Sequence, residues 1–485
     1  MTTGECQETG VFPTGASQDM DTTAENQNAG VRKESVLVNR DVRRTLFSMA
    51  FPMLAGTFAM NAYSLTDMWF VSRLGTLPMA AMGFVFPVIM ILTCVAGGIG
   101  TGVMTLVSHS LGRHDHKLAA RITSHGLLLT TLATLLLAII GYFSVEPVFS
   151  WLGADASTLP HIRKYMAIWY LGALTMSLPM LGNGILISTG DSKSASHVMM
   201  IGPAINVVLN PIMIFGYLGF PAMGIAGSAL ATVVAQAISA VWLLILLDKR
   251  HGLLKFAPLE ISACLTSFKN ILSFGIPSIL SMILMPVSAT VITKILSSLG
   301  NEAVAASGAA GRIEMFAFII PMSLGMSLTP FVSQNFGAER IDRIKEAIEV
   351  STRFAIIYGI AVSIVFFLSA PFMASMFTSD AKVSEILVSY IRIISFGYGM
   401  MEVHRYCGFV LTGLHRPASA TVLNSVRVLV LLIPLSYLGV YLGGVKGVFI
   451  GRLATDLLAG GIGIAWAYKA CAAAKLNVES LHKSV

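Results

Sequence analysis

The chain contains twelve apolar runs, each long enough to cross a membrane as a helix. The hydrocarbon layer of a bilayer is about 30 Å thick, which takes roughly 20 residues of helix. In lipid every backbone amide needs an internal partner, so a spanning segment is a helix or a strand of a closed barrel. These runs lack the short alternating pattern of barrel strands. The sequence therefore predicts an all-α integral membrane protein with twelve transmembrane helices. The expected spans are 46–71, 80–107, 118–141, 164–188, 196–217, 225–247, 270–297, 303–333, 347–369, 388–412, 418–440 and 445–468.

Few residues of the chain are charged. Charged side chains make up 12% and hydrophobic ones 55%, whereas ordinary soluble domains are about 25% charged. This composition excludes a soluble enzyme, a nucleic-acid-binding protein and a disordered scaffold. The net charge of +7 comes from basic residues scattered between the apolar runs, so we expect no nucleic-acid partner. The five cysteines lack the spacing of a metal site, so we expect no metal and no cofactor.

Lysine and arginine are distributed unevenly between the two sets of loops. With the N-terminus placed inside, the inner segments contain 21 basic residues and the outer segments contain 5. Cytoplasmic loops of membrane proteins carry such an excess. We therefore expect a multi-pass protein of the cytoplasmic membrane with both termini in the cytoplasm.

The two halves of the sequence resemble each other at a nearly constant offset. Glycine and proline residues 220 to 225 positions apart match in many places, among them Pro52/Pro277, Gly75/Gly300, Gly83/Gly308, Gly112/Gly337, Pro211/Pro434 and Gly224/Gly444. Six helices in each copy give the two lobes the same orientation, with a parallel pseudo-twofold axis along the membrane normal. Parallel repeats of this kind are found in transporters, which hold the substrate between the lobes. The expected regions are 1–45 (a disordered polar, then basic, cytoplasmic tail), 46–247 (first lobe), 248–269 (cytoplasmic linker), 270–469 (second lobe) and 470–485 (cytoplasmic tail).

Asp67 is the only acidic residue within the spans of the first lobe. Topology places it in the outer half of the bilayer, in the same layer as Asn206, Asn210, Ser228 and Thr232. An ionised carboxylate in hydrocarbon is costly, so Asp67 needs partners or a proton. Oxygen ligands of this kind suit hard cations, and the five side chains are our candidate cation-coupling site. The alternatives are that Asp67 binds water near the outer interface and that the asparagines only join helices.

Several motifs resemble those of the multidrug and toxic compound extrusion (MATE) family over about residues 40–470. Pro52 is followed fifteen residues later by Asp67, and this acid in the first helix resembles the DinF-like branch. The other motifs are SHSLGRHDHKLAAR, SQNFGAERIDR, STGDSKSA, NVVLNPIMIF and GIAGSALAT. The resemblance implies antiport, in which entry of a cation drives export of a small organic molecule by alternating access.

The resemblance also implies a cation site made of the first-helix Asp, two polar residues of an NxxxDP motif and a Thr of the sixth span. Asp67, Asn206 and Thr232 match this pattern, but Asn210 stands where the family has Asp. With one carboxylate in place of two, a proton is the expected coupling ion, and sodium remains the alternative. Pro52 either forms a static kink or allows a bend that follows protonation of Asp67.

The spans of the second lobe contain more charge than those of the first. They include six basic and three acidic residues: Lys294, Arg312, Arg392, Arg405, Arg427, Arg452, Glu314, Glu402 and Asp456. One interpretation pairs Glu402 with Arg405 and Arg452 with Asp456 along their own helices. The other interpretation places charges on the wall of a substrate cavity. The candidate cavity residues are Arg312, Glu314, Glu402, Arg405, Arg427, Arg452 and Asp456.

These features favour a cation-coupled exporter over three other functions. The main alternative is a flippase for lipid-linked precursors of the same superfamily. An intramembrane enzyme is not expected, because the spans contain neither an acidic metal motif nor a Ser/His pair at matched depth. A channel is disfavoured because no ring of charge repeats in both lobes. We expect a monomer in contact with membrane lipid. The expected substrates are cationic or zwitterionic organic molecules, and the excess of basic residues in the second lobe makes anionic molecules a further candidate class.

Overall fold

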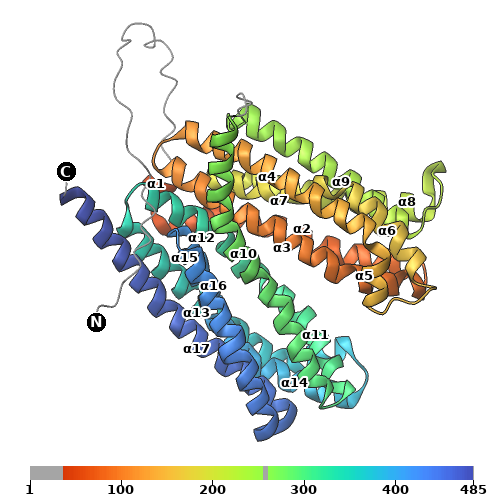
Figure 1. Cartoon of the computed structure of the whole chain (residues 1–485). Coiled ribbons are helices and arrows are strands. Elements are labelled where there is room, and N and C mark those ends of the chain that lie inside the picture. Colours follow the sequence, from red (N-terminus) through yellow and green to blue (C-terminus); the bar gives the residue numbers. More distant parts are fainter. Residues whose placement is uncertain (1–35, 255–259, 484–485) are drawn as a thin grey trace, which may run out of the picture. The chain divides into compact units, whose positions relative to one another are not determined.

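The structure is a computed structural model that describes residues 36–254 and 260–483. The expected polar tail before residue 36 and the linker residues 255–259 lie outside the described residues. Every regular element in the described part is helical (Figure 1). The elements are α1 (Val36–Asn39), α2 (Val42–Ser72), α3 (Thr76–Gly112), α4 (His116–Phe143), α5 (Val145–Trp151), α6 (Leu159–Leu171), α7 (Ala173–Ser188), α8 (Ser192–Phe215), η1 (Tyr217–Gly219), α9 (Ile225–Ile245), η2 (Leu246–Arg250), α10 (Ile261–Ser297), α11 (Asn301–Ala317), α12 (Ile319–Gly337), α13 (Ile341–Phe377), α14 (Ala381–Ile394), η3 (Ser395–Gly397), α15 (Tyr398–Gly413), α16 (Pro417–Ser425), η4 (Val426–Leu432) and α17 (Ile433–Lys483).

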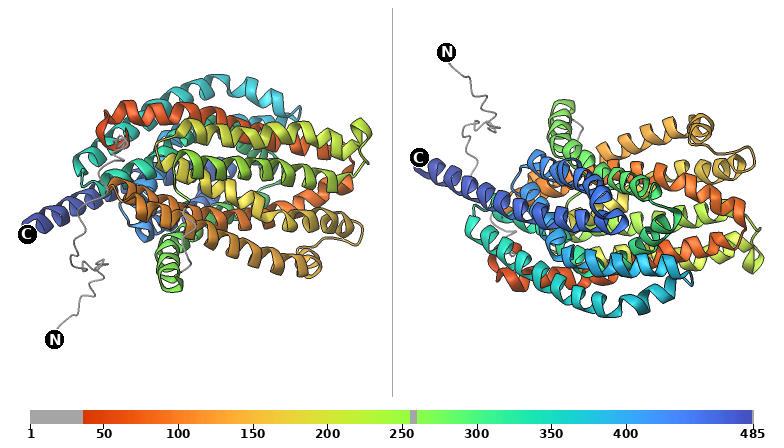
Figure 2. Two further views of the ribbon diagram at one scale, coloured as in Figure 1. Left: turned by 90° about the horizontal axis from the view of Figure 1, so that it is seen from above. Right: turned by 90° about the horizontal axis from the view of Figure 1, so that it is seen from below.

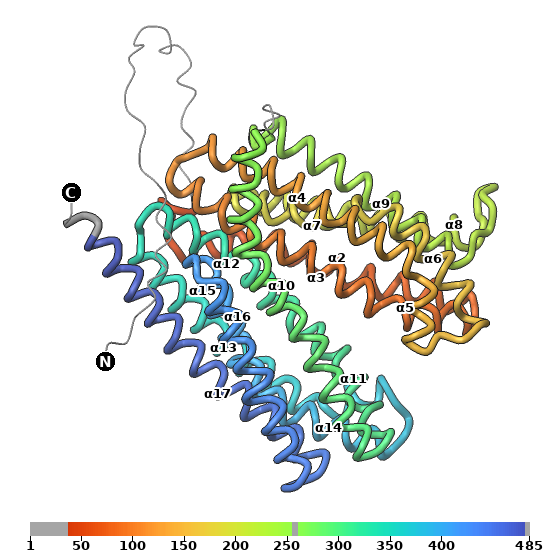
Figure 3. Tube along the Cα trace, viewed as in Figure 1, coloured from red at the N-terminus to blue at the C-terminus, as the bar shows by residue number. Residues whose placement is uncertain are grey.

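The described helices account for the twelve expected crossings. Eight are long and apolar enough to span a membrane, and two bent pairs, α6–α7 and α11–α12, bring the number to ten. One of the eight, Pro417–Ser480, contains most of α17. It reverses direction at Gly443 and Gly444, whose backbone is not helical, so it provides two crossings in place of one (Figure 3). The two limbs are antiparallel, because Gly439 lies against the Gly447 carbonyl. Helix α2 is not among these apolar helices, but its 31 residues are long enough for it to be the twelfth crossing.

Aspartate side chains begin several of these helices. Asp41, Asp115 and Asp380 each accept hydrogen bonds from backbone amides in the first turn of the helix that follows, which supplies partners that the helix cannot provide itself. Asp191 caps α8 in the same way and also pairs with Arg250 at 3.2 Å. Burial opposes ionisation of Asp191, but hydrogen bonds from His251 and Ser194 and the Arg250 charge outweigh it, so the pKa of Asp191 lies well below its usual value. This pair ties the start of α8 to the end of the α9–η2 helix.

A hydrogen bond that occurs once in each half shows the duplication at atomic level. Ser196 donates to the carbonyl of Pro52, and Thr421 donates to the carbonyl of Pro277 at 2.6 Å. Both partners are displaced by 225 residues from one bond to the other. In each lobe the hydroxyl group of the fifth helix therefore holds the first helix at its internal proline. Figure 2 shows the long helices of the bundle lying side by side.

Large apolar side chains cover the outward faces of several helices. On α13, Ile357, Ile360, Ile364 and Leu368 are each more than half exposed and recur every three or four residues. An exposed apolar stripe of this size would be unfavourable in water, whereas lipid tails cover it at no cost. The stripe is therefore the lipid-facing side of α13.

The lobes share one hydrophobic core and have two separate ones. The shared core contains residues from both halves, such as Leu46, Ile185, Phe331 and Tyr406. A second core contains only residues 295–449, and a third only residues 81–229. Most members of the shared core lie in the parts of their helices nearer the turns at 113–115, 189–191, 338–340 and 414–416. We call this end of the bundle, where the basic loops lie, the basic end.

Backbones from the two lobes touch directly at the basic end. A Cβ atom on Gly112 would lie 2.1 Å from the Gln334 carbonyl oxygen, and a Cβ atom on Gly337 would lie 2.3 Å from the His109 carbonyl oxygen. The two contacts are related by the 225-residue offset, so each lobe meets the other in the same way. Only glycine permits this approach, because any side chain would overlap the opposite backbone. We call this pair of contacts the glycine crossing.

The boundaries of the linker and of the C-terminal tail differ from the expected ones. Residues 261–269 belong to α10, because they lack Gly and Pro and place Cys264 in a buried position. The expected tail continues α17 to Lys483, since Ala470, Cys471 and Ala474 pack into the shared core. Helix α2 remains helical through Pro52, so no break separates its two ends.

Candidate functional site

Asp67 lies within α2, far from the basic end, and is 8% exposed. Its Oδ1 atom accepts hydrogen bonds from Asn210 Nδ2 and Ser228 Oγ, both at 2.9 Å. These donors belong to α8 and α9, so one carboxylate oxygen joins three helices of the first lobe. Both partners were among the residues that topology placed in this layer.

The asparagines extend this hydrogen-bond network away from the carboxylate. Asn210 Nδ2 also donates to Asn206 Oδ1 at 2.8 Å, which fits their spacing of four residues on one helix face. Asn206 Nδ2 donates to Thr232 Oγ1 at 3.0 Å, and Thr232 donates to the Ser228 carbonyl. All five expected side chains therefore lie together in one connected cluster.

Two tyrosines lie near the cluster, and neither was among the expected site residues. Tyr63 shares a hydrogen bond of 3.2 Å with Thr232 and lies one turn before Asp67 on α2. Tyr165 of α6 is buried, within electrostatic range of Asp67. The spacing of four residues from Tyr63 to Asp67 was an available signal. For Tyr165 the available signal was its match with Tyr390 at an offset of 225.

The cluster contains one acid, and no ion pair involves it. Among the described residues no Lys, Arg or His lies within salt-bridge distance of Asp67. Asn210 Oδ1 is buried and has no hydrogen-bond partner, which is unusual for a buried acceptor. The site therefore contains a carboxylate without a counter-charge next to an unused acceptor. This arrangement can take up a proton or a small cation.

The equivalent place in the second lobe is filled by a salt bridge. Arg452, at the repeat position of Thr232, donates to both carboxylate oxygens of Glu314 at 2.9 and 3.0 Å. Tyr390 donates to Glu314 at 3.0 Å and also contacts Arg452. Ile292 stands where the first lobe has Asp67. The side chain of Arg452 thus provides a fixed positive charge in this lobe.

Further ion pairs of the second lobe agree only partly with the expected ones. Arg405 lies 3.0 Å from Glu402 on the same helix, as expected. The expected pair of Arg452 with Asp456 is wrong, because Asp456 receives two hydrogen bonds from Arg427, at 2.7 and 3.1 Å. A guanidinium reaching across from another helix can donate two bonds to one carboxylate, which a neighbour on the same helix cannot match here.

Burial also corrects the expected cavity wall. Asp456 is 0% exposed and Glu402 is 1% exposed, so neither carboxylate lines an open cavity in this conformation. The guanidinium of Arg405 lies over the Phe318 ring, at the bend between α11 and α12. Asp456, Glu402 and Arg405 therefore pack in the interior of the second lobe in this conformation.

Arg312 is the exception among the charges at middle depth. It is exposed on α11, and no hydrogen bond or ion pair within the described residues involves it. Lys294 and Arg392 are also exposed, but Arg392 stacks on Phe367. The other three basic residues of the expected set, Arg405, Arg427 and Arg452, each face an acid. Arg312 therefore carries an unbalanced charge.

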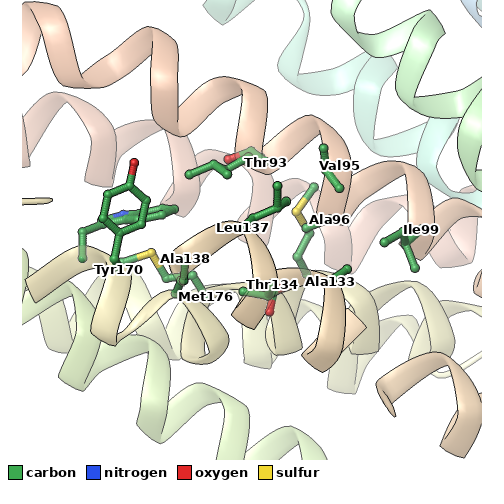
Figure 4. Close-up of a pocket in the computed structure, with 15 residues that line it drawn as sticks. Thr93, Val95, Ala96, Ile99, Ala133, Thr134, Leu137, Ala138, Tyr170 and Met176 are labelled. Atoms are coloured by element: carbon green, nitrogen blue, oxygen red, sulfur yellow. The ribbon is translucent and has the colours of Figure 1, made fainter. Parts of the chain in front are cut away.

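A small cavity of about 50 Å³ lies in the first lobe between α3, α4, α6 and α7. Its lining is mainly apolar, with the Trp169 and Tyr170 rings and the thioethers of Met176 and Met180. Figure 4 shows Tyr170 and Met176 at one end of this cavity and Ile99 towards the other. Thr93 and Thr134 add hydroxyl groups.

The MatE family model matches the chain twice, at residues 52–212 and 277–438. The two matches begin 225 residues apart, the offset of the internal repeat, and together cover more than half of the chain. An "FAD transporter" of Shewanella oneidensis is 35% identical over 428 residues, which are 87% of this chain and 94% of that protein. The "probable multidrug resistance protein YoeA" of Bacillus subtilis is 26% identical over 74% of this chain and 78% of its own length.

A solved structure has the same fold. The MATE transporter VcmN of Vibrio cholerae, in its bent form, superimposes with a TM-score of 0.85 at 26% identity, over 90% of this chain and 98% of that one. The Shewanella and Vibrio proteins are named as transporters, so these comparisons support neither an enzyme nor the flippase alternative. The chain belongs to the MATE family and is a multi-pass membrane transporter that exports small organic molecules by cation-coupled antiport.

Proposed function

We propose that this transporter exchanges protons for anionic organic molecules of the flavin-dinucleotide class. The observation that carries the proposal of proton coupling is the single carboxylate of Asp67, surrounded by neutral hydrogen-bond partners. A proton needs one basic atom. Sodium needs several oxygen ligands at once, and most oxygens of this cluster already take part in hydrogen bonds to one another.

The proposed orientation puts the basic end in the cytoplasm of the cell, with both termini inside. The excess of Lys and Arg in the loops of that end supports it. The shared core and the glycine crossing then close the cytoplasmic side. In this conformation Asp67 would receive its proton from outside, and separation of the lobes at the basic end would follow. We expect the transporter to act as a monomer.

Two observations support an anionic substrate. The Shewanella relative is named as an FAD transporter, and FAD carries a pyrophosphate with negative charge. Arg312 offers an unbalanced guanidinium, and it shares an exposed stripe of α11 with Ala305, Gly308 and Phe316. This stripe lacks the bulky aliphatic side chains of the lipid-facing side of α13. Charged side chains within a membrane face water or a ligand and not lipid, so Arg312 is suited to bind the substrate's anionic group.

The coupling ion can be identified by measuring uptake of FAD into vesicles that contain the purified protein with its cytoplasmic side facing the medium. With an acidic vesicle interior and no sodium gradient, FAD is expected to accumulate above its equilibrium level. A sodium gradient at equal pH is expected to give no accumulation. Accumulation driven by sodium alone would contradict proton coupling. Transport of an organic cation but not of FAD would favour drugs as the substrates, in line with the multidrug resistance in the name of the Bacillus relative.

Arg312 is expected to distinguish anionic from cationic substrates. Arg312→Gln should slow FAD transport by about tenfold to a hundredfold, the loss expected for a charged hydrogen bond of about 1.5–3 kcal/mol, and should leave transport of an organic cation unchanged. Arg392→Gln is the matched control, because it removes an exposed arginine of the same lobe that stacks on Phe367. An equal loss for both substrates, or no loss, would contradict this role of Arg312.

A further inference from the structure

Two histidine rings, one from each lobe, meet at the basic end. His109 lies in the last turn of α3, and His415 lies in the turn between α15 and α16, with ring centroids 4.3 Å apart. Phe274 of α10 meets the His415 ring edge-on at 5.0 Å, and Phe336 of α12 lies 5.4 Å from His415 and 5.6 Å from His109. The two imidazoles are thus enclosed by aromatic rings where the lobes join.

The environment of the pair favours uncharged rings. His109 Nδ1 and His415 Nε2 are buried and have no hydrogen-bond partner. Burial and then the neighbouring His109 ring lower the pKa of His415 to about 3. The charge of Arg113, next to α3, opposes a positive charge on His109, whereas a hydrogen bond to the Ser333 carbonyl of α12 favours it. Phe274 of α10 faces the His415 ring. Arg416 is the next residue after His415 in the turn between α15 and α16. No described carboxylate acts on either ring.

The backbone of His415 has an unusual conformation for a residue with a side chain. Its φ is 61°, whereas the equivalent turn of the first lobe uses Gly190, with φ of 80°. The left-handed region costs free energy for residues other than glycine, although histidine adopts it more often than most. A side chain retained at such a position is a reason to look for a function.

The pseudo-symmetric contact uses a residue that cannot titrate. Gln334 is 225 residues from His109, and its Nε2 donates to the Ser188 carbonyl across the interface at 2.6 Å. That hydrogen bond does not depend on pH. The first copy of the repeat therefore has an ionisable ring where the second has an amide.

We propose that the His109–His415 pair is a second proton-binding site, on the cytoplasmic side, and that its protonation separates the lobes there. Alternating access requires this contact to break, and a charged imidazole in an aromatic enclosure without a carboxylate would break it. The proton enters from the cytoplasm on opening and returns there on closing. It therefore adds nothing to the exchange at Asp67, and the pair regulates opening whether protons or sodium ions drive transport.

The direction of the pH effect follows from linkage. In the closed state the pair is neutral, and once the lobes separate, water restores His415 towards its ordinary pKa of 6.5. The contact therefore stabilises the closed side fully above that value and loses this contribution progressively as the pH falls towards 3. For one proton, the ratio of open to closed molecules should rise about tenfold between pH 7.5 and pH 5.5.

Distances between spin labels on the two lobes can test the proposal. Labels at the exposed Lys117 and Arg340 positions, in full-length protein whose five cysteines are replaced by alanine, would report opening of the basic end in lipid nanodiscs. The ratio of separated to closed molecules is expected to rise about tenfold from pH 7.5 to pH 5.5. In the double variant His109→Gln, His415→Gln this rise should fall below about twofold, because no proton binds to glutamine at either position.

His114→Gln is the matched control, because His114 has the same left-handed backbone, with φ of 60°, in an exposed turn. It should keep the full pH response. The response should also persist in Asp67→Asn, which separates this proposal from that of proton coupling. A pH response retained by the double variant, or absent from the folded unaltered protein, would overturn the proposal. Unchanged thermal unfolding at pH 7.5 verifies that the variants are folded.

Discussion

Replacing Asp67 with asparagine is expected to lower pH-driven export by about a hundredfold, near the upper range of coupling free energies between two sites. Asparagine nearly preserves the shape of the carboxylate, and its oxygen can still accept from Asn210 and Ser228. It cannot change charge, so the exchange of proton for substrate loses its driving step. The measurement is the initial rate of substrate uptake into inside-out vesicles with an acidic interior.

Two further variants show whether the effect belongs to the coupling site. Asp155→Asn makes the same chemical change at an exposed aspartate outside the spans and should transport normally. Asn210→Asp restores the second carboxylate that the family pattern has, and we expect it to introduce a dependence on sodium. If Asp67→Asn transported at the normal rate, protonation of this residue could not be the coupling step.

Replacing Asp456 with asparagine is expected to destabilise the second lobe by about 3–5 kcal/mol. Asp456 is fully buried, and it neutralises Arg427, which is itself mostly buried. The substitution leaves the guanidinium without a counter-charge inside the protein. Denaturant unfolding in mixed micelles, followed by circular dichroism, measures the difference.

The double variant Arg427→Met, Asp456→Leu removes both charges and should recover much of the lost stability, since apolar pairs often replace buried ion pairs without loss. Glu302→Gln is the exposed counterpart, because Glu302 pairs with Lys382 at 3.1 Å on the surface. It should change the unfolding little, as surface pairs usually do. Equal destabilisation by the exposed and buried substitutions would rule out burial as the cause.

Topology made the first-lobe site predictable. Helix direction and residue number fix the depth of a side chain, and this was enough to place Asp67, Asn206, Asn210, Ser228 and Thr232 together. The repeat was equally visible, because glycine and proline positions persist where backbones touch or helices bend. The twelve crossings followed from the bilayer thickness.

Rotation of the helices about their axes was not predictable in the same way. Depth alone allowed Arg452 to pair with Asp456 on its own helix, but the side chain of Arg452 points towards Glu314 on α11. The same limit applies to Tyr165, a buried residue of another helix within electrostatic range of Asp67. The aromatic enclosure of His109 and His415 depends on how the lobes meet, and residues 306 positions apart give no local pattern in the sequence.

The glycine crossing has a consequence for how the lobes can part. Each lobe fits against the main chain of the other at two places exchanged by the pseudo-twofold axis, with no side chain between them to yield gradually. Loss of one of these contacts requires loss of the other, so opening should occur as a single concerted step without an intermediate that keeps one contact. The two contacts would then act as one pivot for both lobes, and glycine is required at both Gly112 and Gly337.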